Sequence, residues 1–261
     1  MLTTSFKKLK PFGAETSSHS LLENPAELRS LVLENKLMVF KNVKQTKESL
    51  ISLSSKLSIN QGPIQKQLLH WDFGPIMEME AKVDPKNYLF SEESVPFHWD
   101  GAFLKEPLFL VFYCVKTSST AGGETLFSDS EAMWTQMSQK KKEDVAKICI
   151  EYETEKLAHY GGKIQVNFVQ EHPYKKSTIL RFGEAVNTTM NPVRVSVLNH
   201  NKEKGDGFYK ETTQSLYDPQ FCYTHHWEEG DLLIADNFSL LHARNALCDN
   251  KERKFLRLQV L

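Results

Sequence analysis

The first sixty residues switch between helical and strand-like spacing of apolar side chains. A helix is predicted to begin at Pro25, because Asn24 can cap it and an apolar stripe of leucine and valine then follows at helical spacing. The apolar run at 37–40 predicts a strand, and residues 48–57, with leucines on one face, predict a second helix. This pattern indicates a helical N-terminal portion, about residues 1–60, that packs against the rest of the chain.

From about residue 61 the pattern changes to short apolar runs separated by glycine, proline and asparagine. The runs with the length of strands are 109–115, 148–153, 163–169, 178–182, 232–235 and 255–261. Many short strands with turn residues between them are typical of a β-sandwich or jelly roll. We therefore expect a mainly β fold with flanking α-helices.

Further helices are predicted in the second half of the chain. A capping box that begins at Ser128 predicts one at 128–137, and the pattern predicts others at 138–148 and 207–217. The sequence contains no internal repeat, low-complexity tract or linker. We therefore expect a single domain that spans residues 1–261.

Composition and charge exclude several classes of protein. Forty per cent apolar and 25% charged residues are ordinary globular values, and 32 basic residues against 33 acidic ones favour neither nucleic acid nor an anionic membrane as a partner. The four cysteines are widely spaced, which argues against a disulfide framework. No secretory signal is visible, and the longest apolar run, 108–115, is too short to span a bilayer. These features predict a cytoplasmic protein with neither nucleic acid nor a membrane as partner, and they leave homo-oligomer formation open. The small-molecule substrate is an expectation from the family resemblance given below.

The segment His98-Trp99-Asp100 carries the first candidate chemistry. On an extended segment, residues i and i+2 point to the same face, so His98 and Asp100 can aim at one point while Trp99 turns the other way. One histidine and one aspartate make two thirds of a facial iron(II) site, and a second histidine must come from elsewhere. The best candidate is His242, which follows an apolar strand and a polar loop. The H-x-D pattern alone is a weak signal.

Two further residue types strengthen this interpretation. We expect the strand at 253–260 to return beside the His242 segment as a hairpin, which brings Arg253 next to His242. Arginine suits a buried carboxylate because its planar fork binds both oxygens. Thr125, on another predicted strand, adds a hydroxyl donor. The set matches iron(II) with a dicarboxylate co-substrate, although Arg244 competes with Arg253 for the carboxylate.

At this point the chain resembles the TauD/TfdA family of iron(II)- and 2-oxoglutarate-dependent dioxygenases. The matching segments are Phe97-His98-Trp99-Asp100-Gly101, Gly122 to Phe127, and Gly230 to Arg244 with Arg253 and Arg257 beyond. The resemblance implies a double-stranded β-helix (jelly roll), with His98, Asp100 and His242 as the iron ligands and O2 as a co-substrate. It also implies that Thr125 and Arg253 bind 2-oxoglutarate, and that Arg257 lies near the co-substrate or a substrate anion.

A narrower resemblance is to the oxygenases of isonitrile biosynthesis, of the paerucumarin and rhabduscin type. The segments that carry it are 71–75, 87–90, 155–163 and 181–184. It implies a secondary-metabolic substrate derived from tyrosine or tryptophan, whose amine has become an isocyano group. The implied reaction is desaturation of the Cα–Cβ bond, with or without loss of the carboxylate. Candidate substrate-binding residues are His159, Tyr160, Lys163, Phe97 and Phe103.

Other functions stay open at this stage. One is a TauD-like hydroxylase of another small acid such as a sulfonate. A zinc hydrolase can also use two histidines and an aspartate, although Arg253 and Thr125 have no evident role there. A third possibility, from a different class, is a non-catalytic jelly-roll protein that binds or stores a metal.

Overall fold

Two helices and the strand between them form at residues 25–57, where the sequence predicts them. The computed structural model describes residues 6–80, 93–117, 122–155, 161–187, 192–248 and 252–261. Helix α1 (Pro25–Asn35) starts where the Asn24 side chain accepts the Glu27 N–H. Helix α2 (Lys47–Leu57) starts at a capping box formed by Thr46 and Ser49. Before, between and after these helices lie η1 (Ser20–Glu23), strand β3 (Leu37–Phe40) and helix α3 (Ile64–Gln67).

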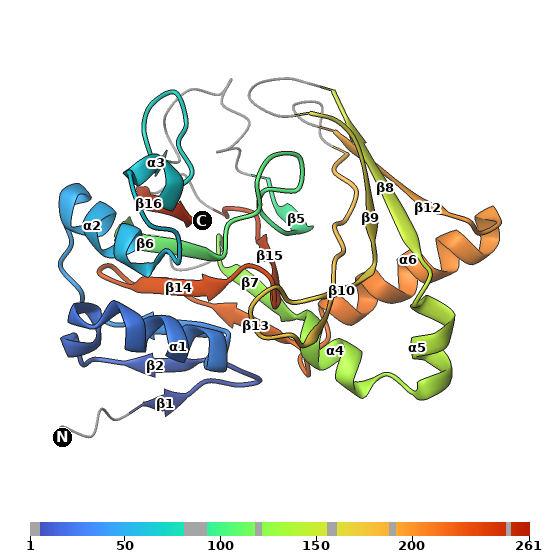
Figure 1. The fold of residues 1–261 in the computed structure, drawn as a ribbon, viewed down its shortest axis with the longest axis horizontal. Coiled ribbons are helices and arrows are strands. Elements are labelled where there is room, and N and C mark those ends of the chain that lie inside the picture. The colour runs from blue at the N-terminus through green and yellow to red at the C-terminus, as the bar shows by residue number, and fades with distance from the viewer. Residues whose placement is uncertain (1–5, 81–92, 118–121, 156–160, 188–191, 249–251) are drawn as a thin grey trace.

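The largest sheet has the strand order β1-β2-β3-β14-β6-β16-β4, and its strands β3 and β14 are buried on both faces. The bounds not yet given are β1 Lys7–Lys8, β2 Ala14–Thr16, β14 Leu232–Asp236, β6 Phe109–Thr117, β16 Arg253–Val260 and β4 Met77–Glu80. Because side chains alternate along a strand, Val111 and Ile234 pack beneath α1 and α2 while Phe112 and Leu233 point the other way. Each such buried side chain contributes about 1.5–3 kcal/mol to folding. Figure 1 shows the helices against this sheet.

A second sheet faces the inner side of the first. Its strands are β13 (Cys222–His225), β7 (Thr125–Asp129), β15 (Leu240–Arg244) and β5 (Val95–His98), in that order. Phe127 and Leu240 of this sheet pack against Leu110 and Phe112 of the large one. The two facing sheets confirm the predicted jelly roll, and β5 and β15 bring two of the three predicted metal ligands into its interior.

Residues 130–216 form a further layer beyond β5 (Figure 1). Its elements are α4 (Ser130–Gln136), α5 (Gln139–Val145), β8 (Cys149–Thr154), β9 (Gly162–Asn167), β10 (Val169–Glu171), β11 (Thr178–Leu180), β12 (Val193–Leu198) and α6 (Lys202–Leu216). Ile150 and Tyr152 of β8 join Phe97 and Trp99 in a second core. This core therefore supports the metal-ligand segment from its outer side.

The predicted hairpin between the His242 strand and the strand at 253–260 is wrong. Strand β15 pairs with β5 and β7, whereas β16 pairs with β6 and β4. Both edges of β16 are satisfied inside the large sheet, and most of its side chains are buried there. Arg253 consequently enters the interior from the sheet opposite His242.

Two helix starts also differ from the sequence prediction. Asp129, not Ser128, caps α4, because its carboxylate accepts the N–H groups of the next turn while Ser128 ends up inside β7. Helix α6 begins at Lys202, five residues earlier than expected, because the Asn201 side chain caps it. In the described residues, no helix is both long and apolar enough to cross a membrane.

Candidate metal centre and co-substrate site

The predicted metal ligands come together inside the jelly roll. The Nε2 atoms of His98 and His242 lie 3.7 Å and 3.6 Å from Oδ1 of Asp100. All three ligand atoms lie within 4.8 Å of one another. A first-row metal about 2.1 Å from each ligand atom needs neighbouring ligand atoms about 3–3.5 Å apart. The geometry thus fits two histidines and one aspartate on a single face of an iron ion.

The protein presents the two imidazoles in the form that binds metal. Burial lowers the pKa of His98 to about 4 and that of His242 well below its ordinary value, so both rings are neutral near pH 7. The Nδ1 atom of His98 lies 2.9 Å from the Pro96 carbonyl. A proton on Nδ1 is donated to that carbonyl, which leaves the Nε2 lone pair for the metal.

The three ligand side chains differ in exposure. The side chains of Asp100 and His242 are each 7% exposed, whereas that of His98 is 36% exposed. Asp100 is the first turn residue after β5, so it points back toward the ring of His98. Among the three ligands in the described part of the chain, His98 is thus the most accessible to a small molecule.

Residues from β16 and from the loop after β14 hold Asp100. Oδ2, the oxygen turned away from the histidines, accepts hydrogen bonds from Arg257 and Gln259. The side chain of Asn237 accepts the Asp100 N–H at 3.0 Å and donates to the Asp100 carbonyl at 3.2 Å. The sequence analysis missed Asn237 and Gln259. The sequence did contain a signal for each: Asn237 is a polar residue directly after the apolar strand β14, and Gln259 is a polar residue within the apolar strand β16.

A buried arginine, also missed as a supporting residue, fixes the same turn from outside. Arg181 is fully buried, donates to the Asn237 carbonyl at 2.7 Å and pairs with Glu106 at 3.3 Å. Glu106 also accepts the indole N–H of Trp99 at 2.7 Å. Two residues further on, Gly183 lies beside the Trp99 ring, and Glu184 exchanges hydrogen bonds with the Phe97 backbone. Segment 181–184, identified by resemblance, therefore holds the metal-ligand strand.

The expected 2-oxoglutarate residues lie on the two facing sheets. Thr125 starts β7 and is 7% exposed. Arg253 starts β16, and a Cβ atom on Gly123 would lie only 1.6 Å from its Nη1, so the guanidinium packs directly against that backbone. Burial lowers the pKa of Arg253 to about 10. Among the described residues, no carboxylate lies within ion-pair distance of Arg253, which suits an anion supplied from outside.

Arg244, the competing candidate, lies near the same place. It follows His242 by two residues on β15, so both side chains share a face, and it is paired with Thr125 across the sheet. Its Nη2 donates to the Glu93 carbonyl. Burial and, second, the positive charge of Arg244 lower the pKa of Arg253.

The candidate substrate residues are not gathered at the metal. Phe97 is fully buried on the face of β5 opposite His98, against Tyr217, and belongs to the second core. Phe103 packs at the edge of the same core. Lys163 lies on the outer face of β9, whereas the next residue, Ile164, points to the second core. The Lys163 side chain pairs with Glu151 at 3.0 Å. Strand alternation turns the side chains of both Phe97 and Lys163 away from the metal ligands. His159 and Tyr160 lie outside the described residues.

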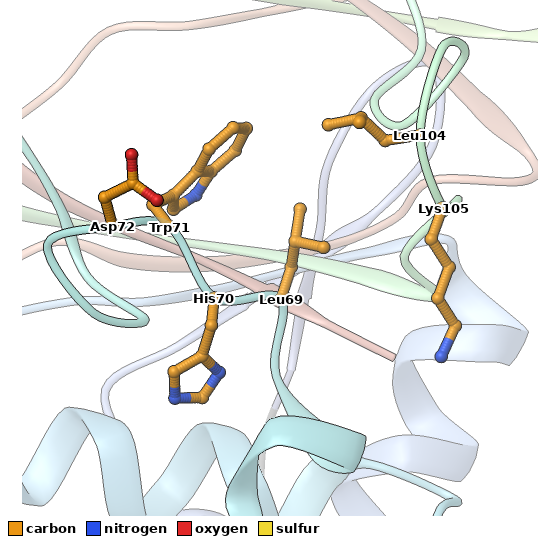
Figure 2. Close-up of a pocket in the computed structure, with 6 residues that line it drawn as sticks. All are labelled: Leu69, His70, Trp71, Asp72, Leu104 and Lys105. Atoms are coloured by element: carbon orange, nitrogen blue, oxygen red, sulfur yellow. The ribbon is translucent and has the colours of Figure 1, made fainter. Parts of the chain in front are cut away.

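An open pocket lies beside the metal-ligand turn. Its lining residues are Leu69, His70, Trp71, Asp72, Leu104 and Lys105. Figure 2 shows the side chains of Leu69, Trp71 and Leu104 directed toward one space, with His70 and Lys105 turned away. Gly101, which follows Asp100, has a φ of 85°, and a Cβ atom there would lie 2.3 Å from the Lys105 carbonyl. One pocket wall therefore packs directly against the metal-ligand turn.

The fold and the ligand set define a class of oxygenase. The family model described as "Taurine catabolism dioxygenase TauD, TfdA family" matches residues 5–259. The chain belongs to this family, and it is an iron(II)- and 2-oxoglutarate-dependent oxygenase.

Two similar proteins and one protein of solved structure act in isonitrile biosynthesis, according to their names. The chain is 38% identical to 3-((Z)-2-isocyanoethenyl)-1H-indole synthase of Fischerella ambigua over 98% of its own length and 95% of that protein. It is 31% identical to tyrosine isonitrile desaturase of Pseudomonas aeruginosa, over 74% of this chain and 68% of that one. A solved structure of PvcB, described as an iron, α-ketoglutarate-dependent oxygenase from an isonitrile synthetic pathway, matches with a TM-score of 0.77. That match has 24% identity and covers 99% of this chain and 91% of the other, and it shows the fold.

Proposed function

We propose that this oxygenase desaturates the Cα–Cβ bond of an isocyano acid derived from tryptophan or tyrosine, with or without loss of the carboxylate. The observation that carries the proposal is the 38% identity to the indole synthase across nearly the whole of both chains. The aligned part of the chain includes the three metal ligands. It also includes Thr125 and Arg253, the two residues of the expected carboxylate clamp. The tryptophan-derived substrate is the first choice because the tyrosine enzyme is less similar and matches less of the chain.

The residues at the site have separate tasks. His98, Asp100 and His242 hold iron(II), and Thr125 and Arg253 bind the far carboxylate of 2-oxoglutarate. When bound, iron and 2-oxoglutarate activate O2 to remove hydrogen from the substrate, with release of succinate and carbon dioxide. The protein supplies fixed geometry, because Asn237 holds the ligand turn on both sides of Asp100.

Binding of the substrate is proposed beside His98, the most exposed of the three metal ligands. An isocyano acid lacks the ammonium group of its parent amino acid, so the site needs a cation for the carboxylate and no acidic partner for an amine. Arg257 supplies this positive charge in the proposal, because its guanidinium donates to the carboxylate of Asp100 and so lies beside the metal ligands. The aromatic end of the substrate needs apolar walls, and Leu69, Trp71 and Leu104 provide them beside the metal-ligand turn.

We also propose a cytoplasmic location and reaction on a free small molecule. Nearly equal numbers of basic and acidic residues support this, because neither nucleic acid nor an anionic membrane is favoured by such a chain. A single domain over the whole length and homo-oligomer formation stay predictions.

A second candidate is hydroxylation of another small acid, such as a sulfonate. The family description, which names taurine catabolism, favours it. The test is to incubate the iron-loaded enzyme with 2-oxoglutarate and either an indole isonitrile acid, a phenol isonitrile acid or taurine, and to identify products by mass. An isonitrile product that has lost two hydrogens supports the proposal. A product that has gained one oxygen, formed only from taurine, contradicts it.

A further inference from the structure

A tryptophan outside the predicted site contacts both halves of the expected carboxylate clamp. Trp227 follows β13 and lies in the loop before β14. Its indole N–H donates to Oγ1 of Thr125 at 2.9 Å. Its ring meets the Phe255 ring edge-on, with centroids 4.8 Å apart. The guanidinium carbon of Arg253 lies 4.5 Å from the centroid of that same Phe255 ring.

The direction of the hydrogen bond to Thr125 matters most. An indole nitrogen can only donate, so Oγ1 of Thr125 must be the acceptor. A threonine hydroxyl carries one proton of its own, and this proton has no acceptor within the part of the chain that the structure describes. Trp227 therefore turns the hydroxyl so that it can donate to an incoming anion.

The ring of Trp227 is itself held in place. His225 meets it edge-on at 4.4 Å, and His225 is anchored by Asp231 at 3.2 Å. Arg253 lies against Gly123, two residues before Thr125, so the two clamp residues reach the same backbone segment. One indole thus orders the hydroxyl by a hydrogen bond and supports the guanidinium through Phe255.

We propose that Trp227 is a positioning residue for 2-oxoglutarate: it orients the Thr125 hydroxyl toward the far carboxylate and supports the ring on which Arg253 rests. This inference rests on the proposed roles of Thr125 and Arg253. Trp227 does not touch the metal ligands, so it tunes co-substrate affinity and leaves iron affinity unchanged.

The test measures 2-oxoglutarate binding without turnover. Anaerobic titration of the iron-loaded enzyme gives a weak visible charge-transfer band, and its amplitude yields the Kd. Trp227→Phe keeps a ring but loses the N–H, and it should raise the Kd for 2-oxoglutarate roughly threefold to tenfold, the usual loss for one hydrogen bond. Iron affinity, measured separately, should stay at the wild-type value. Trp134→Phe, at a tryptophan on α4 that contacts Lys142, is the matched control and should change neither quantity.

A double-mutant cycle separates orientation of Thr125 from general damage. If Trp227 acts through the hydroxyl, Trp227→Phe has a smaller effect in a Thr125→Val background than in the wild type. In a Thr125→Ser background, which keeps a hydroxyl, the full loss should return. An equal loss in the wild-type and valine backgrounds, or an unchanged Kd in Trp227→Phe, overturns the proposal. Arg253→Ala tests the proposed clamp itself: if that variant binds 2-oxoglutarate normally, the underlying assignment fails, independently of Trp227.

Discussion

Asn237 holds Asp100 by two reciprocal hydrogen bonds, although 137 residues separate them in the chain. The amide oxygen of Asn237 accepts the Asp100 N–H, and the amide nitrogen donates to the Asp100 carbonyl. The same amide nitrogen also reaches the Pro107 carbonyl at 2.9 Å. These hydrogen bonds satisfy both backbone groups of Asp100, although its turn is not part of a sheet.

Asn237→Ala should weaken metal binding without removing a ligand. It leaves the Asp100 backbone groups unpaired, so the turn that carries the carboxylate can shift. Losses of this kind typically cost about 10–100-fold in metal affinity. Iron or manganese titration with the purified variant checks the effect. The control is Asn60→Ala, at a half-buried side-chain amide that donates to the Lys66 carbonyl at 3.1 Å. A wild-type metal Kd in Asn237→Ala would show that the turn needs no such support.

Removal of any one metal ligand should abolish iron-dependent turnover. His98→Ala, Asp100→Ala and His242→Ala each take one of three protein ligands from the facial set. The loss in metal affinity should exceed the roughly 10–100-fold range typical of supporting residues. Metal content after dialysis and succinate release report it together. A variant with full activity would remove its residue from the site.

Arg253→Ala should raise the 2-oxoglutarate requirement far more than the substrate requirement. Loss of one member of a buried charged pair costs about 3–5 kcal/mol, and the corresponding Kd rises on the order of 10²-fold or more. Thr125→Val should show a smaller loss of about 1–2 kcal/mol. The apparent KM for each reactant separates the two requirements. If Arg244→Ala shows the large effect instead, Arg244 is the clamp.

Gly123→Ala offers a charge-neutral check of that clamp. A methyl group there would collide with the Arg253 guanidinium, which must then move. The variant keeps both arginines and the Thr125 hydroxyl. We expect it to weaken 2-oxoglutarate binding while iron still binds at wild-type affinity; unchanged 2-oxoglutarate binding would mean that Arg253 is placed elsewhere.

The sequence predicted the strands and the metal ligands because both have local signals. Continuous apolar runs marked β6 and β14, and the H-x-D spacing predicted that His98 and Asp100 aim at one point, although Asp100 does so from the turn after β5 and not from an extended strand. Pairing of distant strands has no such signal: β15 and β16 are neighbours in sequence but lie in facing sheets. The predicted hairpin failed for that reason.

The supporting residues were hidden for a related reason. Arg181 resembles any charged residue in sequence, yet it is fully buried between Glu106 and Asn237. Its partners are 75 and 56 residues away, so no local spacing reveals them. Lys163 shows the reverse case. It lies in a segment that resembles the isonitrile oxygenases and was expected to bind substrate, but its side chain lies on the outer face of β9 and pairs with Glu151.

Acid should weaken the fold through Asp231. Burial alone would raise its pKa, but hydrogen bonds from His225 and Lys41 hold the pKa of Asp231 below its ordinary value. The stability that this carboxylate contributes is therefore present above about pH 4 and is lost as the pH falls through the lowered value. Lys41→Met should reduce the free energy of unfolding by about 2–3 kcal/mol at neutral pH, because it leaves a buried carboxylate without its cation.

Urea unfolding at several pH values checks this prediction. The difference between wild type and Lys41→Met should shrink below about pH 4, as Asp231 takes up a proton first in the unfolded chain and, at lower pH, in the folded protein. Lys7→Met, in an exposed pair with Glu15, should change stability by no more than about 0.5 kcal/mol. A difference that stays constant down to acid pH would exclude Asp231 as the responsible group.

The most direct test of the account is the coupling of succinate release to consumption of an isonitrile. Purified enzyme with iron(II), O2 and 2-oxoglutarate is offered a tryptophan-derived isocyano acid, its tyrosine analogue, taurine and the parent amino acids. The account predicts equal amounts of succinate formed and isonitrile consumed, with a product lighter by two hydrogens or one that has also lost carbon dioxide. Tight coupling with taurine or an unmodified amino acid, and none with either isonitrile, would contradict it.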